Sequence, residues 1–289
     1  MQSLYEITTN VFEPISRFWS SERTERAVSG VLVLLFLVAL AGIECKRQGF
    51  LPPALAAITP SNHFHAVSLA FTLVLILEVI GLIFVLPCSF SKSVGKQFEI
   101  LSLILLRNSF KALVDLPEPI HLTGDWSPVL TIAAEGVGAL LVFALLGFYY
   151  KVQNPNYRTA KSGYRRYCFI ASKKMVAMVL LVIFSVLGGK ALWQGITGHH
   201  TFDFFDTFYT VLIFADILLV LLSQRFLPGY QAVFRNSGYA LSTLFIRLAL
   251  AAPPPYNILL GIGAAVFAVA MTLIFNAFYA QFNQAKEHA

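Results

Sequence analysis

The stretch from residue 63 to residue 115, HFHAVSLAFTLVLILEVIGLIFVLPCSFSKSVGKQFEILSLILLRNSFKALVD, decides the class of fold. An apolar run that carries one acid, Glu78, ends at Pro87, and the run that follows carries Arg107 and Lys111. Each run is close to the roughly 20 residues that an α-helix needs to cross about 30 Å of hydrocarbon. The pattern therefore predicts two neighbouring membrane-spanning helices with charged side chains at lipid depth.

The rest of the chain is also much more apolar than a soluble domain. Of its 289 residues, 57% are hydrophobic and 12% are charged, whereas soluble domains have about 25% charged residues. We therefore expect an all-α integral membrane protein with about eight transmembrane helices. The expected spans are residues 27–43, 66–86, 94–114, 129–150, 175–192, 204–222, 230–250 and 258–282.

Two connecting segments predict the orientation in the membrane. Residues 151–174 contain seven Lys or Arg and no acid, whereas residues 115–126 contain three acids and no Lys or Arg. Cytoplasmic loops of membrane proteins are enriched in Lys and Arg, so the first segment is predicted to be a cytoplasmic loop and both termini to be cytoplasmic. Lys46 and Arg47 oppose this arrangement, because they would follow the first span on the outer side.

The chain divides into four parts on this reading. Residues 1–26 form an amphipathic surface helix or a cytoplasmic tail, and residues 27–150 form a first four-helix half. Residues 151–174 form the basic cytoplasmic loop, and residues 175–289 form a second four-helix half.

The second half resembles the first in its charges, which predicts two parallel four-helix repeats. An offset near 138 aligns Glu78 with Asp216 and brings Arg107 close to Arg247. A second register competes, since Arg107-Asn108-Ser109 matches Arg235-Asn236-Ser237 at an offset of 128. Transporters often consist of two related halves with a site at their interface, although common helix chemistry also produces some of this similarity.

The charges at lipid depth are the candidate functional residues. An unpaired carboxylate there costs roughly 2.5 to 3.5 kcal/mol on insertion scales, so Glu78 and Asp216 should be protonated, paired or hydrated. Arg107 is the natural partner of Glu78, whereas Arg247 reaches Asp216 only if the helices are tilted or displaced. Glu135 could add a further acid to this intramembrane polar centre. The alternative is that these groups are structural ion pairs that tether helices.

Four histidines lie just before two of the expected spans: His63, His65, His199 and His200. If the two halves pack together, they could bind a divalent metal on the outer side. No nucleotide or haem motif is present. The net charge of +6 is explained by the basic loops of a membrane protein, so no nucleic-acid partner is expected.

The sequence favours a polytopic membrane protein that translocates or senses an ion or small solute through these intramembrane charges. The alternative is a non-catalytic subunit or scaffold of a larger membrane complex. Besides the lipid bilayer, the partners could be further copies of this chain or other subunits. The sequence does not favour an enzyme, because it has no GxSxG or HExxH motif.

Overall fold

The regular structure consists of helices. The computed structural model describes residues 2–53, 59–116, 126–153, 163–197, 204–226 and 229–287. Over these ranges the elements are α1 (Gln2–Trp19), α2 (Glu22–Arg47), α4 (Phe64–Val85), α5 (Phe90–Lys111), the short 3-10 helix η1 (Ala112–Asp115), α6 (Ser127–Val152), α7 (Tyr164–Thr197), α8 (Phe204–Phe226), α9 (Tyr230–Ala251) and α10 (Tyr256–Glu287). Most of the acidic segment lies outside the described residues, as do residues 154–162 of the expected basic loop. Residues 164–174 of that expected loop belong to α7, so this helix begins earlier than the predicted span.

Local sequence signals explain where several helices begin. Ser21 precedes α2, and its side chain accepts a hydrogen bond of 3.2 Å from the Thr24 N–H. Ser89 does the same for α5, where it accepts a bond from the Lys92 N–H. Such caps satisfy the N–H groups that have no partner in the first helical turn. Because Pro87 stands just before this cap, the chain turns sharply between α4 and α5.

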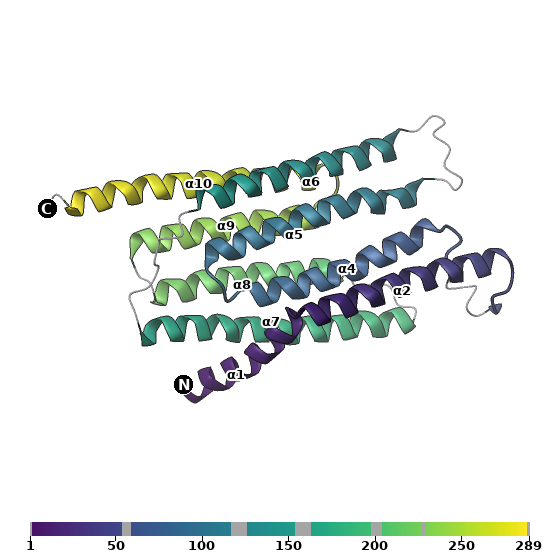
Figure 1. Cartoon of the computed structure of the whole chain (residues 1–289), viewed down its shortest axis with the longest axis horizontal. Helices are drawn as coiled ribbons and strands as arrows, with labels where there is room; N and C mark the ends of the chain where they lie inside the picture. The colour runs from purple at the N-terminus through teal and green to yellow at the C-terminus, as the bar shows by residue number, and fades with distance from the viewer. Residues whose placement is uncertain are drawn as a thin grey trace.

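The long helices run back and forth along one common direction (Figure 1). The last turns of α4, α6 and α8 and the first turns of α5, α7 and α9 lie at one end of the bundle, together with α1 and the C-terminal part of α10. We call this the basic end, because Lys151, Lys173 and Lys174 lie on the helices there. From α2 onward, consecutive long helices are therefore antiparallel, while α4 and α8 run in the same direction, as do α5 and α9.

Two hydrophobic cores meet along α5. The first core contains buried residues of α1, α4, α5, α7 and α8, with Phe208 and Leu212 at its centre. The second contains buried residues of α5, α6, α9 and α10, with Leu101 and Val142 at its centre. In this second core α5 contacts α9, and α6 contacts α10. The interior of the protein is thus a pair of packed helix groups that share α5.

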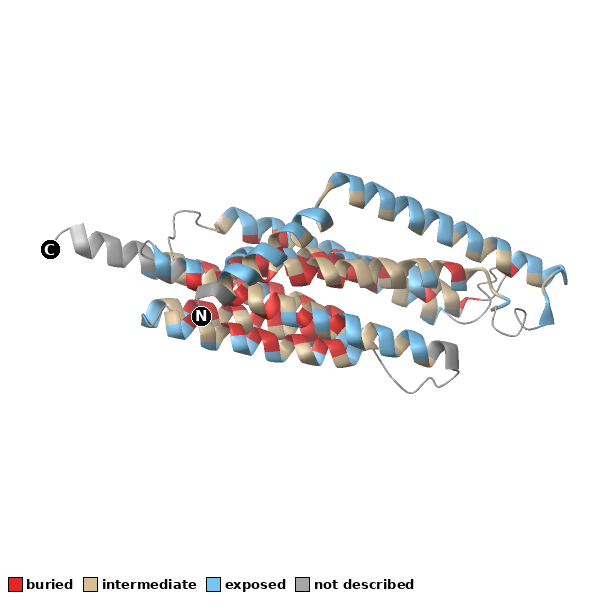
Figure 2. Cartoon of the chain, turned by 90° about the horizontal axis from the view of Figure 1, so that it is seen from below, coloured by how far each residue is buried: buried red, intermediate tan, exposed pale blue. Residues whose placement is uncertain are grey.

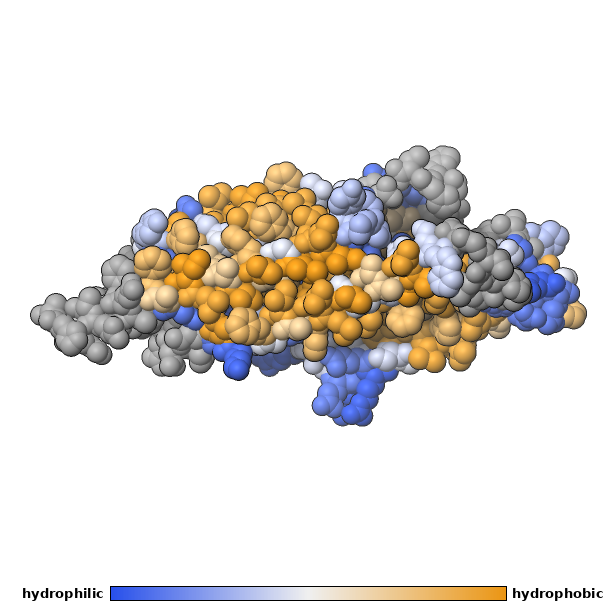
Figure 3. Space-filling model, turned by 90° about the horizontal axis from the view of Figure 1, so that it is seen from above, coloured by the Kyte–Doolittle hydropathy of each residue, from blue (hydrophilic) through white to orange (hydrophobic). Residues whose placement is uncertain are grey.

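Six of the described helices are long and apolar enough to cross a membrane: α2, α4, α6, α7, α8 and α10. Side chains on the outer surface of these helices are mainly apolar, and Figure 3 shows predominantly hydrophobic colour over the middle of the molecule's length. Apolar surface of this extent is compatible with lipid rather than water as the surrounding solvent. The chain is therefore an all-helical, multi-pass integral membrane protein.

The helices α5 and α9 are as long as their neighbours, yet they are more polar. Thirteen residues of α5 are buried, among them Ser91, Gln97 and Arg107. On α9 the buried residues include Arg235 and Arg247. These polar side chains face other helices and not the outer surface, which is the expected placement for charged residues at lipid depth.

The N-terminal helix α1 packs against the bundle at the basic end. Phe12 is buried in the first core. The centroids of the Trp19 and Phe84 rings are 5.9 Å apart. Lys174 Nζ on α7 donates a hydrogen bond of 2.8 Å to Glu13 Oε1. Residues 2–19 are therefore a docked helix and not a free tail.

By contrast, α2 has little contact with the rest of the chain. It contacts α4 and, near its start, α1. Figure 2 shows it as a predominantly exposed helix that lies apart from the buried centre. Val33, Leu34 and Leu37 are more than half exposed. Its apolar surface is available to lipid.

Candidate intramembrane polar site

The first buried ion pair joins α4 to α5. Arg107 Nη1 donates a hydrogen bond of 3.0 Å to Glu78 Oε2. The Arg107 side chain is 7% exposed and the Glu78 side chain 16% exposed. The pairing that the sequence predicts for these two residues is therefore present. A hydrogen-bonded pair of opposite charges offsets part of the cost of keeping both side chains away from water.

The second buried ion pair joins α8 to α9 in the same way, but it is looser. Arg247 Nε lies 3.6 Å from Asp216 Oδ2. Neither atom has a hydrogen-bond partner, and Arg247 Nη2 also lacks one. Arg247 is only 1% exposed. Unsatisfied charged atoms in such surroundings are costly, so this pair is the less stable of the two arrangements.

The two arginines occupy equivalent positions on their helices. Arg107 lies 18 residues after Ser89, the N-cap of α5, and Arg247 lies 18 residues after Gly229, the N-cap of α9. Each arginine pairs with an acid on the preceding helix. The acids lie on α4 and α8, which contribute to the first hydrophobic core, and the arginines lie on α5 and α9, so both pairs lie where the two helix groups meet.

Tyr209 on α8 links the two pairs, and the sequence analysis did not identify it. Its side chain is 5% exposed, and its phenol interacts electrostatically with Arg107 and with Arg247. Tyr209 stands seven residues before Asp216, which is two helical turns and therefore places both on one face of α8. That spacing is the signal by which it could have been found.

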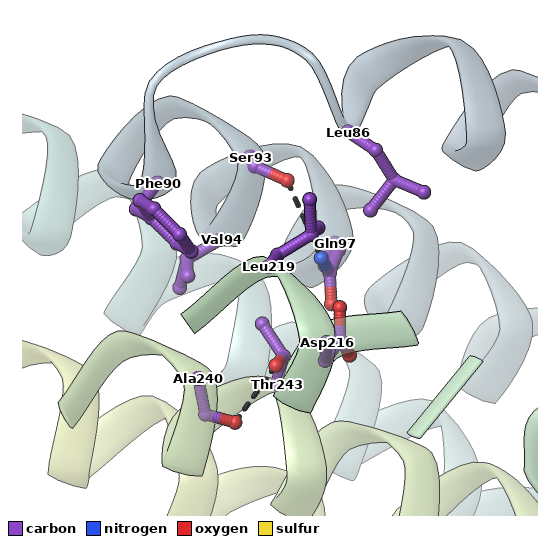
Figure 4. A pocket seen from close by; sticks show the side chains of 9 residues that line it. All are labelled: Leu86, Phe90, Ser93, Val94, Gln97, Asp216, Leu219, Ala240 and Thr243. Atoms are coloured by element: carbon purple, nitrogen blue, oxygen red, sulfur yellow. Dashed lines mark hydrogen bonds between the residues drawn. The ribbon is translucent and has the colours of Figure 1, made fainter. Parts of the chain in front are cut away.

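A small cavity lies beside Asp216 on the side toward the basic end. Its lining comes from α5, α8, α9 and the end of α4 (Figure 4), and consists of Leu86, Phe90, Ser93, Val94, Gln97, Asp216, Leu219, Ala240 and Thr243. Figure 4 shows the side-chain oxygens of Gln97 and Asp216 pointing toward each other. The cavity has room for about one water-sized guest.

Glu135 lies apart from these pairs. It is fully buried on α6, and its Oε1 accepts a hydrogen bond of 2.6 Å from Asn257 Nδ2 on α10. No salt bridge joins it to a described Lys or Arg. Glu135 therefore links α6 to α10 near their other end, and the structure does not bring it together with Glu78 or Asp216.

Only two of the four histidines of the predicted metal site, His63 and His65, are among the described residues. His63 lies near Glu44, with 3.3 Å between His63 Nε2 and Glu44 Oε2, and its Nδ1 is 3.2 Å from Arg47 Nη1. His65 is exposed at the start of α4. His199 and His200 lie outside the described residues. Among the residues that are described, no three His, Cys, Asp or Glu side chains are grouped as they would be around a metal ion.

No family model, no curated protein and no solved structure matches the chain. Buried carboxylates beside guanidinium groups can change their pairing with protonation, with a bound ion or with the membrane potential.

Proposed function

We propose that this protein translocates or senses an ion or small solute through the polar centre formed by Glu78, Arg107, Asp216 and Arg247. The observation that carries the proposal is the difference between the two pairs. The Glu78–Arg107 pair is hydrogen-bonded. In the second pair, Arg247 Nε and Asp216 Oδ2 are 3.6 Å apart, both partners have atoms without a hydrogen bond, and a small cavity lies beside them. An ion pair retained only to tether helices would have little reason to leave these atoms unsatisfied in a dry interior.

The same proposal assigns a topology of eight spans. The helices α5 and α9 would cross the membrane inside a ring of more apolar helices, and residues 27–150 and 175–289 would be parallel repeats. Support comes from the equal positions of Arg107 and Arg247 and from the common direction of α5 and α9. Two related halves with charged residues at their junction are a common plan of transporters.

The excess of Lys and Arg at the basic end supports a cytoplasmic location for that end. Both termini would then be cytoplasmic, since α1 and the last turns of α10 lie at the same end.

The experiment is a flux and charge-movement assay on the full chain in liposomes and planar bilayers. Sodium, potassium, proton and chloride fluxes are measured with and without an applied potential. We expect flux or a voltage-dependent charge movement in the parent protein, and its loss in Glu78→Gln and Asp216→Asn. Glu22→Gln is the matched control, because Glu22 is an exposed carboxylate in a surface pair. A parent protein with neither flux nor charge movement removes the proposal.

A second candidate function is that of a non-catalytic subunit of a larger membrane complex. It is favoured by α2, whose apolar side chains contact little of this chain. Cross-linking from cysteines placed at Val33 and Leu37 in native membranes distinguishes the two. Specific protein adducts together with an electrically silent purified chain support the subunit, whereas adducts with lipid alone contradict it.

A further inference from the structure

The lining of the cavity beside Asp216 includes four polar side chains, and each of them carries an oxygen atom. These side chains come from three helices: Ser93 and Gln97 from α5, Asp216 from α8 and Thr243 from α9. Two of their buried oxygens, Gln97 Oε1 and Asp216 Oδ2, have no hydrogen-bond partner. Such a pair suits an electropositive guest, because buried acceptors without a donor or a cation are costly.

The Gln97 side chain presents its oxygen to the cavity. Its amide nitrogen donates a hydrogen bond of 3.4 Å to Ser93 Oγ, one helical turn earlier. The Oε1 atom is then left without any partner, although Gln97 is only 1% exposed. The free acceptor is therefore aimed away from its own helix.

The Oδ2 atom of Asp216 also lacks a donor. Thr243 is close enough to interact with it, yet the Thr243 hydroxyl donates its proton to the Ala240 carbonyl at 2.8 Å. Arg247 does not supply a hydrogen bond to Oδ2 either. Two unsatisfied acceptors from different helices, Gln97 Oε1 and Asp216 Oδ2, thus meet in one small space.

We propose that this cavity is a binding site for a small monovalent cation of the size of Na⁺, held by the oxygens of Gln97, Asp216, Thr243 and Ser93. The inference rests on the proposed function and specifies the ion that the protein translocates or senses. Hard cations prefer carboxylate, carbonyl and hydroxyl oxygens. The space for about one water-sized guest suits a sodium ion that has shed most of its water.

The charges around the cavity weigh more heavily against a divalent cation than against a monovalent one. Asp216 is the one carboxylate in the lining, and Arg247 lies beside it. The other charged groups near this region are Glu78 and Arg107, which interact with Tyr209 as Arg247 does. Lys173 on α7 is a further one, and its Nζ lies 4.3 Å from the Phe90 ring centroid. This balance gives a divalent ion too little negative charge. It also keeps the binding of a monovalent ion weak enough for release, as conduction requires.

The test uses the purified full chain in lipid nanodiscs. Radioactive ²²Na⁺ binding and the melting temperature are measured while NaCl replaces choline chloride at constant ionic strength. We expect saturable Na⁺ binding and a matching rise in melting temperature. Asp216→Asn should abolish both, and Gln97→Leu should weaken binding by about tenfold or more, since a contact to a charged group is lost.

A gain of function complements these losses, in case a variant fails to fold. Gln97→Glu adds a second carboxylate to the site, so Na⁺ should bind more tightly and Ca²⁺ should begin to bind. Two variants serve as matched controls and should bind Na⁺ as the parent does. Asp206→Asn removes an exposed acid from α8, and Asn276→Leu removes an amide that donates to the Val152 carbonyl.

Each outcome decides the question. No saturable Na⁺ binding by the parent, or a melting temperature that depends on pH but not on Na⁺, overturns the site, and the second result assigns a proton to Asp216. A Gln97→Glu protein that folds without gaining cation affinity also overturns it. Na⁺ binding without flux leaves the site standing and removes transport, whereas flux without Na⁺ binding does the reverse.

Discussion

Arg107 and Arg247 stand at the same distance from the N-caps of their helices, but only Arg107 donates a hydrogen bond to its acid. The first pair is closed by a hydrogen bond, whereas the second leaves Asp216 Oδ2 without a donor beside a small cavity. On the proposed function, the loose pair responds to the ion or solute while the tight pair holds α4 to α5.

Breaking the hydrogen-bonded Glu78–Arg107 pair should strongly destabilise the protein. Glu78→Gln leaves the buried Arg107 without its partner, and we expect a loss of about 3–5 kcal/mol in the free energy of unfolding. The double variant Glu78→Gln with Arg107→Met should recover much of this loss, because no unpaired charge remains. Unfolding in mixed micelles by sodium dodecyl sulfate measures both. The exposed pair supplies the control, since Glu22→Gln should cost less than about 1 kcal/mol. A double variant that is no more stable than Glu78→Gln would contradict this account.

Gly138 and Gly263, which stand in similar sequence contexts, should differ in how far they tolerate replacement by alanine. A Cβ at Gly138 on α6 would lie 2.6 Å from Ile258 Cγ2 on α10, whereas a Cβ at Gly263 would meet nothing within 4 Å. Gly138→Ala should therefore destabilise the protein by about 1–3 kcal/mol through overpacking. Gly263→Ala should be neutral or stabilising by up to about 1 kcal/mol, because glycine weakens a helix. Thermal unfolding of the two variants checks the contrast, and equal effects would show that the α6–α10 contact is not close.

Docking of α1 should depend on pH through Glu13. The hydrogen bond and the charge of Lys174 lower the pKa of Glu13 below its ordinary value, so the folded state favours the carboxylate. The contribution to docking is present above the ordinary pKa of a glutamic acid and is lost as the pH falls through the lowered pKa.

Trp19 reports this docking, because its ring lies beside Phe84. In a protein with Trp126→Phe and Trp193→Phe, Trp19 fluorescence should change as the pH falls below about 4.3. Adding Glu13→Gln should remove that step. A step that persists in Glu13→Gln would assign the titration to another group.

Tyr209 should couple the two ion pairs. Glu78→Gln and Asp216→Asn are combined in a double-mutant cycle, and the coupling free energy should be about 0.5 kcal/mol or more, since Tyr209 interacts with both arginines. Repeating the cycle in the background of Tyr209→Phe should reduce the coupling. The same coupling in both backgrounds would mean that the pairs communicate by another route or only through space.

Much of this fold can be predicted from hydropathy and charge. The predicted bounds of the spans lie within a few residues of α4, α6, α8 and α9, because apolar runs bounded by Pro, Ser and charged residues leave little freedom. The polarity of α5 and α9 also predicts their place among other helices. The number of spans and the repeat remain predictions.

The finer features of the site could not be predicted. Gln97, Thr243 and Tyr209 are residue types that occur on many helices, and only the packing of α5 and α8 against α9 brings these helices together. Likewise, the sequence left α1 open between a surface helix and a tail, since its docking depends on Lys174 and on Phe84 of distant helices. Lys46, which opposes the predicted orientation, donates to the Thr59 carbonyl, a local contact that the sequence does not reveal.

The polar character of α5 and α9 has a consequence for how the chain is made. A helix with buried arginine enters hydrocarbon unfavourably by itself, because the translocon releases segments into lipid according to their apolarity. Neither α5 nor α9 is apolar enough to leave the translocon for lipid by itself. Each of them, however, has a strongly apolar helix before it and after it in the chain. Biogenesis should therefore proceed by joint release, with α5 retained until α6 has been synthesised and α9 until α10 has been. The residues that build the polar centre would then also set the order in which the protein assembles.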